Sequence, residues 1–132
     1  MPLKVTLKPN EKIVINQSVI ENGPVKAELV VLSKATILRD KEILTDADAT
    51  SFGKTLYFLV QMMYLFPETE ADRLPVLKKM LKPTLSKPQN EMKDLLEEIK
   101  RLIDERAYYK ALRICKKVIQ VEEDTPSHGH QQ

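Results

Sequence analysis

The spacing of apolar residues changes at Thr45, and this change restricts the chain to a fold with two unlike parts. Before Thr45, short runs rich in Val and Ile alternate with polar residues, which is typical of β-strands. After Thr45, apolar residues recur every three or four positions, which is typical of amphipathic helices. The sequence therefore predicts an α+β protein with a small antiparallel β lobe at 1–44, a helical lobe at 45–121 and a disordered polar tail at 122–132.

About five short strands are predicted in the β lobe. The first two should form a hairpin around Pro9-Asn10, and Asn22-Gly23 is a strong signal for a tight turn because both residues tolerate positive φ. Strands joined by such turns pair with their neighbours in an antiparallel fashion. The predicted strands are Leu3–Leu7, Lys12–Asn16, Val19–Glu21, Val25–Leu32 and Thr36–Arg39.

About four helices are predicted in the second lobe. Thr45 should cap the first, at roughly 47–66, and Pro67 should end it. Pro75 suits only the start of the second helix, and Pro83 should kink or end that helix. The last two helices should pack as an antiparallel hairpin. The three later segments are Thr69–Leu85, Met92–Ile103 and Ala107–Val118.

The first predicted helix is apolar almost all round, from Leu56 to Phe66, with Gln61 as the interruption. Such a helix is buried on several sides, either by the chain's own lobes or by a partner. We favour burial in the chain's own core, although adjacent methionines also suit an adaptable interface. The residues predicted to contact a protein partner are Tyr57, Phe58, Met62, Met63, Tyr108 and Tyr109.

Composition excludes several classes of protein. The 132 residues are 42% hydrophobic and 30% charged, as in a globular protein. Apolar runs stay short of the roughly 18–20 residues that span a bilayer. Met1-Pro2-Leu3-Lys4 does not resemble a signal peptide, and Cys115 is the only cysteine. We therefore expect a cytoplasmic protein with a buried thiol.

Candidate catalytic and metal-binding groups are few. The two histidines, His128 and His130, fall in the predicted tail without a third ligand nearby. Gly23, Gly53 and Gly129 are isolated and do not form a phosphate-binding loop. We expect neither an enzyme nor a bound metal or cofactor.

Basic residues are more informative. The net charge of +2 is too small for nucleic-acid binding by charge alone, so any such contact would be local. Arg39 ends a predicted strand, and its planar fork can hold a phosphate or a base edge. The alternative is that the basic residues solvate the strands and protect sheet edges. Those in or beside the strands include Lys4, Lys8, Lys12, Arg39 and Lys41.

Six segments, which are spread over most of residues 1–120, are Met1–Lys4, Lys8–Asn16, Leu38–Thr45, Tyr57-Phe58, Gln61–Leu65 and Arg106–Arg113. Taken together and in this order, they resemble the FlbT family of flagellar regulators. The resemblance implies a cytoplasmic repressor that associates with the 5′ untranslated region of flagellin mRNA and promotes its degradation. It also implies a working relationship with a small companion regulator, FlaF.

Residues 3–44 alone resemble, more weakly, the carbon storage regulator, a small dimeric RNA-binding β protein. This resemblance implies a homodimer through the N-terminal strands, with an RNA site made by Val5, Thr6, Lys8 and Arg39. The chain departs from that family's pattern at Leu7, Asn10 and Lys41.

Two functional hypotheses follow. In the first, the β lobe binds the flagellin mRNA leader and the helical lobe binds a protein or a second subunit. In the alternative, the chain is a protein-interaction module or chaperone-like adaptor that binds FlaF or flagellin, and its effect on mRNA is indirect. The residues predicted to contact RNA are Lys4, Thr6, Lys8, Arg39 and Lys41.

Overall fold

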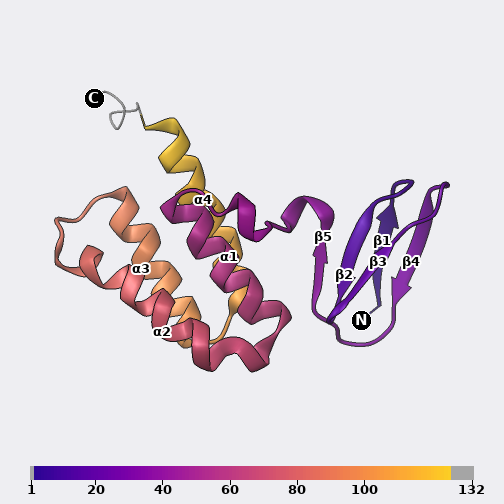
Figure 1. Cartoon of the computed structure of the whole chain (residues 1–132), viewed down its shortest axis with the longest axis horizontal. Helices are drawn as coiled ribbons and strands as arrows, with labels where there is room; N and C mark the ends of the chain where they lie inside the picture. Colours follow the sequence, from indigo (N-terminus) through magenta and orange to yellow (C-terminus); the bar gives the residue numbers. More distant parts are fainter. Residues whose placement is uncertain (1, 126–132) are drawn as a thin grey trace. The chain divides into compact units, whose positions relative to one another are not determined.

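The computed structural model of the chain describes residues 2–125. The chain divides into two compact units between Ile43 and Leu44. Within the described residues, the first unit holds five strands and the second holds four α-helices (Figure 1). The predicted α+β class is therefore confirmed.

The strands of the β unit form two small sheets, and every pairing is antiparallel. β1 pairs with β4 in one sheet, and the order in the other is β3-β2-β5. Each strand starts or ends within two residues of the predicted bounds. The strands are β1 (Leu3–Leu7), β2 (Lys12–Ile15), β3 (Ser18–Glu21), β4 (Ala27–Val31) and β5 (Ile37–Arg39).

The predicted hairpin of the first two strands is wrong, because β1 pairs with β4 and β2 pairs with β3. A turn does form at Pro9-Asn10, with Asn10 at φ 62°, but it redirects the chain instead of reversing it. The pairing continues past this turn, since the N–H of Asn10 donates to the carbonyl of Gly23 at 2.9 Å. The four strands are thus one long antiparallel ribbon with a bend in its middle.

The ribbon reverses at Asn16-Gln17, the two-residue loop between β2 and β3, where Asn16 has φ 56°. Asn22-Gly23 was the stronger turn signal in the sequence, but neither residue has positive φ and β3 does not pair with β4. The tight turn predicted there is therefore wrong. Asn22 instead lies at the bend of the ribbon.

The core of the β unit comes from the alternation of β1 and β2. Val5, Leu7 and Ile13 are buried together. The bend of the ribbon brings the inner faces of the two sheets into contact, so that these side chains meet. Partly buried residues surround them: Ile15, Leu29 and Ile37.

The first helix, α1 (Phe52–Leu65), begins later than predicted. Thr45 caps a separate 3-10 turn, Asp46–Asp48, whose Asp48 carboxylate accepts from the Thr45 N–H at 2.8 Å. Ser51 caps α1 itself by accepting from the N–H of Lys54 at 3.2 Å. Pro67 lies just beyond the end of α1, as predicted.

The second helix is α2 (Glu70–Leu81). Pro75 lies in its second turn, whereas the sequence predicts that Pro75 is tolerated only at the start of the helix. Pro75 deprives the carbonyl of Ala71 of its helical donor, but Ala71 is exposed and water can replace that donor. The chain continues as a 3-10 turn at Lys82–Ser86, so Pro83 ends the α-helix as expected.

The last two helices, α3 (Glu91–Asp104) and α4 (Tyr108–Asp124), pack against each other, and α4 also packs against α1 (Figure 1). Arg106 lies in the turn between α3 and α4 with φ 58°, the left-handed conformation that follows many helices. The hairpin predicted for the last two helices is confirmed. The buried thiol of Cys115, on α4, is also confirmed.

The predicted tail starts too early, because α4 runs through Glu122 to Asp124. The Glu122 carboxylate accepts from the backbone N–H of Gly53 at 3.1 and 3.2 Å and from the Ser51 hydroxyl at 3.3 Å. A carboxylate at a helix N-terminus is stabilised by the unpaired N–H groups there. The rest of the predicted tail, with His128 and His130, lies outside the described residues.

Candidate functional site

The excess positive charge of the chain falls in the β unit. Residues 1–43 contain seven Lys and Arg against five Asp and Glu, whereas residues 44–132 contain fourteen of each. All six lysines of the β unit are exposed. The excess of positive charge therefore lies on the unit that holds the predicted RNA-contacting residues, on a chain whose total charge is nearly balanced.

Strand β1 presents two of the predicted RNA-contacting residues. Lys4 and Thr6 are exposed, while the alternate residues Val5 and Leu7 are buried. Lys8 follows the strand directly and is also exposed. The alternation of a half-buried strand thus places these polar groups on the solvent side.

Arg39, the last residue of β5, reaches the backbone of β1. Its Nη2 donates to the carbonyl of Thr6 and to the carboxylate of Glu11, at 3.2 Å from Oε1 and 3.1 Å from Oε2. The backbone N–H of Arg39 donates to Glu42 at 2.9 Å, which fixes the start of the next turn, Asp40–Glu42. Arg39 therefore joins the ends of two strands that belong to different sheets.

Glu11 is the residue of this site that the sequence analysis missed. Its Oε1 also accepts from the backbone N–H of Lys8 at 2.8 Å. This backbone bond, and then the guanidinium of Arg39, hold the pKa of the Glu11 carboxyl below its usual value. The available signal was an acidic residue three positions after Lys8 in a Pro-Asn turn, although nothing in the sequence linked it to Arg39.

The structure brings together part of the predicted RNA-contacting set. Arg39 meets Thr6 directly, and Lys8 joins them through Glu11. Lys4 lies two residues before Thr6 on the same exposed face. Lys41 lies in the 3-10 turn after Arg39 and is exposed.

Residues predicted to contact a protein partner are divided between the core and the surface of the helical unit. Tyr57 and Met63 are buried. Tyr108 is also buried, and its hydroxyl donates to Glu70, which accepts as well from Arg106 at 3.1 Å. These three side chains offer little surface to a partner.

Three of the predicted partner residues remain accessible to some degree. Phe58 and Met62 lie one turn apart on α1 and are half-buried. Tyr109, on α4, is exposed and packs against Tyr64 with ring centroids 5.6 Å apart.

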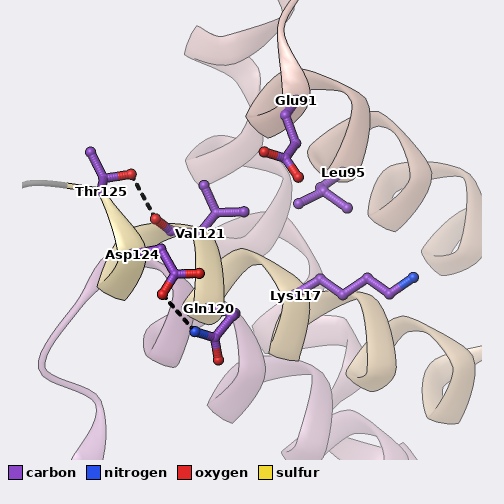
Figure 2. Close-up of a pocket in the computed structure, with 7 residues that line it drawn as sticks. All are labelled: Glu91, Leu95, Lys117, Gln120, Val121, Asp124 and Thr125. Carbon is purple, nitrogen blue, oxygen red and sulfur yellow. Dashed lines mark hydrogen bonds between the residues drawn. The ribbon is translucent and has the colours of Figure 1, made fainter.

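A groove of about 470 Å³ lies between the start of α3 and the end of α4 (Figure 2). Leu95 and Val121 supply its apolar surface. The two hydrogen bonds drawn in Figure 2 connect residues of α4 and Thr125 to each other, so they fix the wall of the groove. The other lining residues are Glu91, Lys117, Gln120, Asp124 and Thr125.

Within residues 2–125, no group of three or more His, Cys, Asp and Glu side chains is placed to hold a metal ion. None of the helices in that range has the length and apolarity required to cross a membrane.

The geometry defines a small α+β protein with exposed lysines on its β unit and an aliphatic core in its helical unit. The family model for the flagellar protein FlbT matches residues 3–125. The chain belongs to the FlbT family, and it is therefore a regulator of flagellar synthesis.

Curated relatives agree along nearly the whole chain. A flagellum biosynthesis repressor protein FlbT of Caulobacter vibrioides is 35% identical, over 97% of this chain and 92% of the relative. Probable flagellum biosynthesis repressors FlbT of Rhodopseudomonas palustris and Caulobacter sp. are 37% and 34% identical, over 94% and 97% of this chain and 97% and 98% of the relatives. These relatives are named as repressors, not as enzymes.

No solved structure matches the chain. The weaker resemblance of residues 3–44 to the carbon storage regulator therefore stays a prediction.

Proposed function

We propose that this chain represses flagellin synthesis by binding the 5′ untranslated region of flagellin mRNA through its β unit and promoting degradation of the message. The observation that carries the proposal is the meeting of Arg39 with Thr6 at the edge of β1, beside the exposed Lys4 and Lys8. Lysine ammonium groups and an arginine fork are the groups that contact RNA phosphates and base edges.

The surface suits a folded RNA with an unpaired loop. Sequence-specific proteins read RNA mainly where its bases are unstacked, and a two-stranded sheet edge with a few cations can contact one such loop. Bound protein would block ribosome access or expose the message to a cellular nuclease. We assign the cleavage to that nuclease and the recognition to this chain.

Salt dependence tests direct binding. If Lys4, Lys8, Arg39 and Lys41 each contact one phosphate, affinity for a flagellin leader RNA should fall about 50-fold between 50 and 200 mM salt. Fluorescence anisotropy with labelled RNA measures this slope. Purified protein that leaves the leader RNA unbound at low salt would contradict the proposal.

Matched variants locate the site. The double substitution Lys4→Gln and Lys8→Gln should weaken binding and reduce the salt slope, because two phosphate contacts are removed. The control, Lys79→Gln with Lys82→Gln, removes two exposed charges from the helical unit and should leave affinity within about twofold. Arg39→Lys is preferable to Arg39→Ala, since Arg39 also bonds the β1 backbone.

A protein partner is the second candidate ligand. The half-buried Phe58 and Met62 on α1 and the exposed Tyr109 on α4 favour it, because aromatic and methionine side chains are frequent at interfaces. FlaF or flagellin would be that partner, and the effect on mRNA would then be indirect. Met62→Lys should abolish co-purification with FlaF or flagellin while RNA affinity is unchanged; retained co-purification would exclude this surface.

A homodimer through the N-terminal strands is compatible with the sheet order. Among the described residues, β1 and β4 pair only with each other, so each has an edge to which a strand of a second copy could add. Light scattering at several protein concentrations tests this. A strict monomer would exclude the shared-strand dimer.

A further inference from the structure

Arg39, the only arginine of residues 1–43, already holds an anion. Its Nη2 lies 3.1 and 3.2 Å from the two carboxylate oxygens of Glu11. A carboxylate and a phosphate present the same kind of paired oxygen acceptors to a guanidinium. An RNA phosphate that approached Arg39 would therefore meet an occupied site.

The two partners of this ion pair are held unequally. The side chain of Glu11 is 12% exposed and is fixed by the N–H of Lys8 at 2.8 Å, whereas the side chain of Arg39 is 38% exposed. Glu11 thus belongs to the turn between β1 and β2, and Arg39 offers a face to solvent. An exchange of anions on Arg39 requires a small movement of the guanidinium and leaves the turn intact.

We propose that Glu11 acts as an internal competitor for the RNA phosphate at Arg39, an inference that rests on the proposed RNA-binding function. A single phosphate must displace the Glu11 carboxylate, which is tethered beside Arg39 and therefore present at a high effective concentration. An RNA that also contacts Lys4 and Lys8 gains enough from those contacts to complete the exchange. Glu11 consequently lowers the affinity of every RNA whose phosphate contacts Arg39, and it has less effect on RNA that makes no use of Arg39.

Glu11→Gln is the direct test, because glutamine keeps the shape and the acceptor for the Lys8 N–H but lacks the charge. The matched control is Glu123→Gln: Glu123 is exposed on α4 in the helical unit, and the substitution changes the net charge by the same amount. The probes are a labelled flagellin leader RNA and a uridine oligonucleotide of equal length, measured by anisotropy at 50 and 200 mM salt.

We expect Glu11→Gln to tighten binding of the leader RNA about fivefold, since the phosphate no longer has to displace a carboxylate from Arg39, and to tighten binding of the uridine oligonucleotide by the same factor or less. Glu123→Gln should change either affinity less than about twofold. Equal effects of the two variants would show that only net charge matters and would overturn the proposal. Weaker binding by Glu11→Gln would also overturn it, because Glu11 would then support Arg39 in its contact with RNA.

The outcomes separate this inference from the proposed function. If the wild-type chain binds the leader RNA but Glu11→Gln does not bind it more tightly, only the competitor role fails. If wild type and both variants leave the RNA unbound at low salt, both proposals fail. Circular dichroism checks that Glu11→Gln is folded. If it is not, Glu11→Asp replaces it, because the shorter side chain places its carboxylate farther from Arg39. Glu11→Asp should then tighten RNA binding, and unchanged affinity would refute the competitor role.

Discussion

Among the side chains that the structure describes, seventeen buried hydrophobic residues lie in the helical unit and five in the β unit. The helical unit is stabilised mainly by burial, since its helices cover one another with Leu, Ile, Val and Met. The β unit has less apolar surface to bury. Its fold must depend more on hydrogen bonds, which contribute less per group.

Two polar side chains, those of Asn22 and Arg39, make hydrogen bonds that connect separate strands and turns of the β unit. The side-chain amide of Asn22 donates to the carbonyls of Leu7, Lys8 and Val25 at 3.4, 2.8 and 2.9 Å, at the bend of the ribbon. Arg39 joins β5 to Thr6 and Glu11. In the β unit, Arg39 both stabilises the fold and belongs to the residues proposed to contact RNA. In the helical unit, the buried residues that stabilise the fold are distinct from the accessible residues proposed to contact a partner.

The largest expected effect is the difference in the rate of thiol labelling at Cys115 between the native and the unfolded chain. Its thiol is fully buried, and burial raises the pKa of that thiol to about 12, so thiolate is scarce at neutral pH. We expect a thiol reagent to label the native chain about a thousandfold more slowly than the urea-unfolded chain, as an opening free energy near 4 kcal/mol implies. Rapid labelling of native protein would show that the helical core opens readily and would break the comparison.

Ile99 and Ile20 compare burial in the two units. Ile99 on α3 is fully buried, and Ile99→Ala should lower the free energy of unfolding by about 2–5 kcal/mol through lost burial and the cavity left behind. Ile20 on β3 is 40% exposed, and Ile20→Ala should cost less than about 1 kcal/mol. Urea denaturation followed by circular dichroism measures both; equal losses would contradict the contrast.

Gly53 and Gly23 give a matched glycine pair. A Cβ on Gly53 would lie 2.5 Å from Glu122 Oε1 and 3.2 Å from the backbone nitrogen of Ile119, so Gly53→Ala should destabilise the chain by about 1–3 kcal/mol. Gly23 lacks close neighbours and positive φ, so Gly23→Ala should stabilise by up to about 1 kcal/mol. Thermal unfolding measures the stability of both variants. Unchanged stability of Gly53→Ala would mean that α1 and α4 can move apart at little cost in free energy.

Asn22 and Asn90 compare polar side chains and carry the smallest expected effect. Asn22→Ala removes the donor to three carbonyls and should cost about 1–2 kcal/mol. Asn90→Ala removes the cap of α3, which accepts from the N–H of Lys93 at 2.8 Å, and should cost about 1 kcal/mol. Urea denaturation should show a larger loss in the free energy of unfolding for Asn22→Ala than for Asn90→Ala. A smaller loss for Asn22→Ala would mean that polar hydrogen bonds contribute less to the stability of the β unit than we infer.

The elements could be predicted from the sequence because each depends on neighbours along the chain. Alternation in Leu3–Leu7 and turn residues such as Asn16 locate the strands, and the apolar stripe of Met92–Ile103 locates α3. Membership of the FlbT family could be predicted as well, since the matching segments are spread along the chain.

Strand pairing could not be predicted, because it depends on the direction in which Pro9-Asn10 sends the chain. A reversal and a bend use the same residue types, and only the packing of Val5 and Leu7 against Ile13 selects the bend. The partner of Arg39 is separated from it by 28 positions, and Glu122, in what reads as a polar tail, caps a helix 69 residues earlier. The contacts of Lys4, Thr6, Lys8, Arg39 and Lys41 with RNA stay a prediction.

The bent ribbon has a consequence for the way the β unit folds. Only two residues, Asn16 and Gln17, must close before Ile15 meets Ser18, and each later pair up to Leu3 and Val31 adds to a ladder already formed. Contacts of short sequence separation form fastest. We therefore expect β2 and β3 to pair first, starting at the Asn16-Gln17 loop, and β1 and β4 to pair after them. The pairing of β5 with β2, which brings Arg39 to Glu11, should come last.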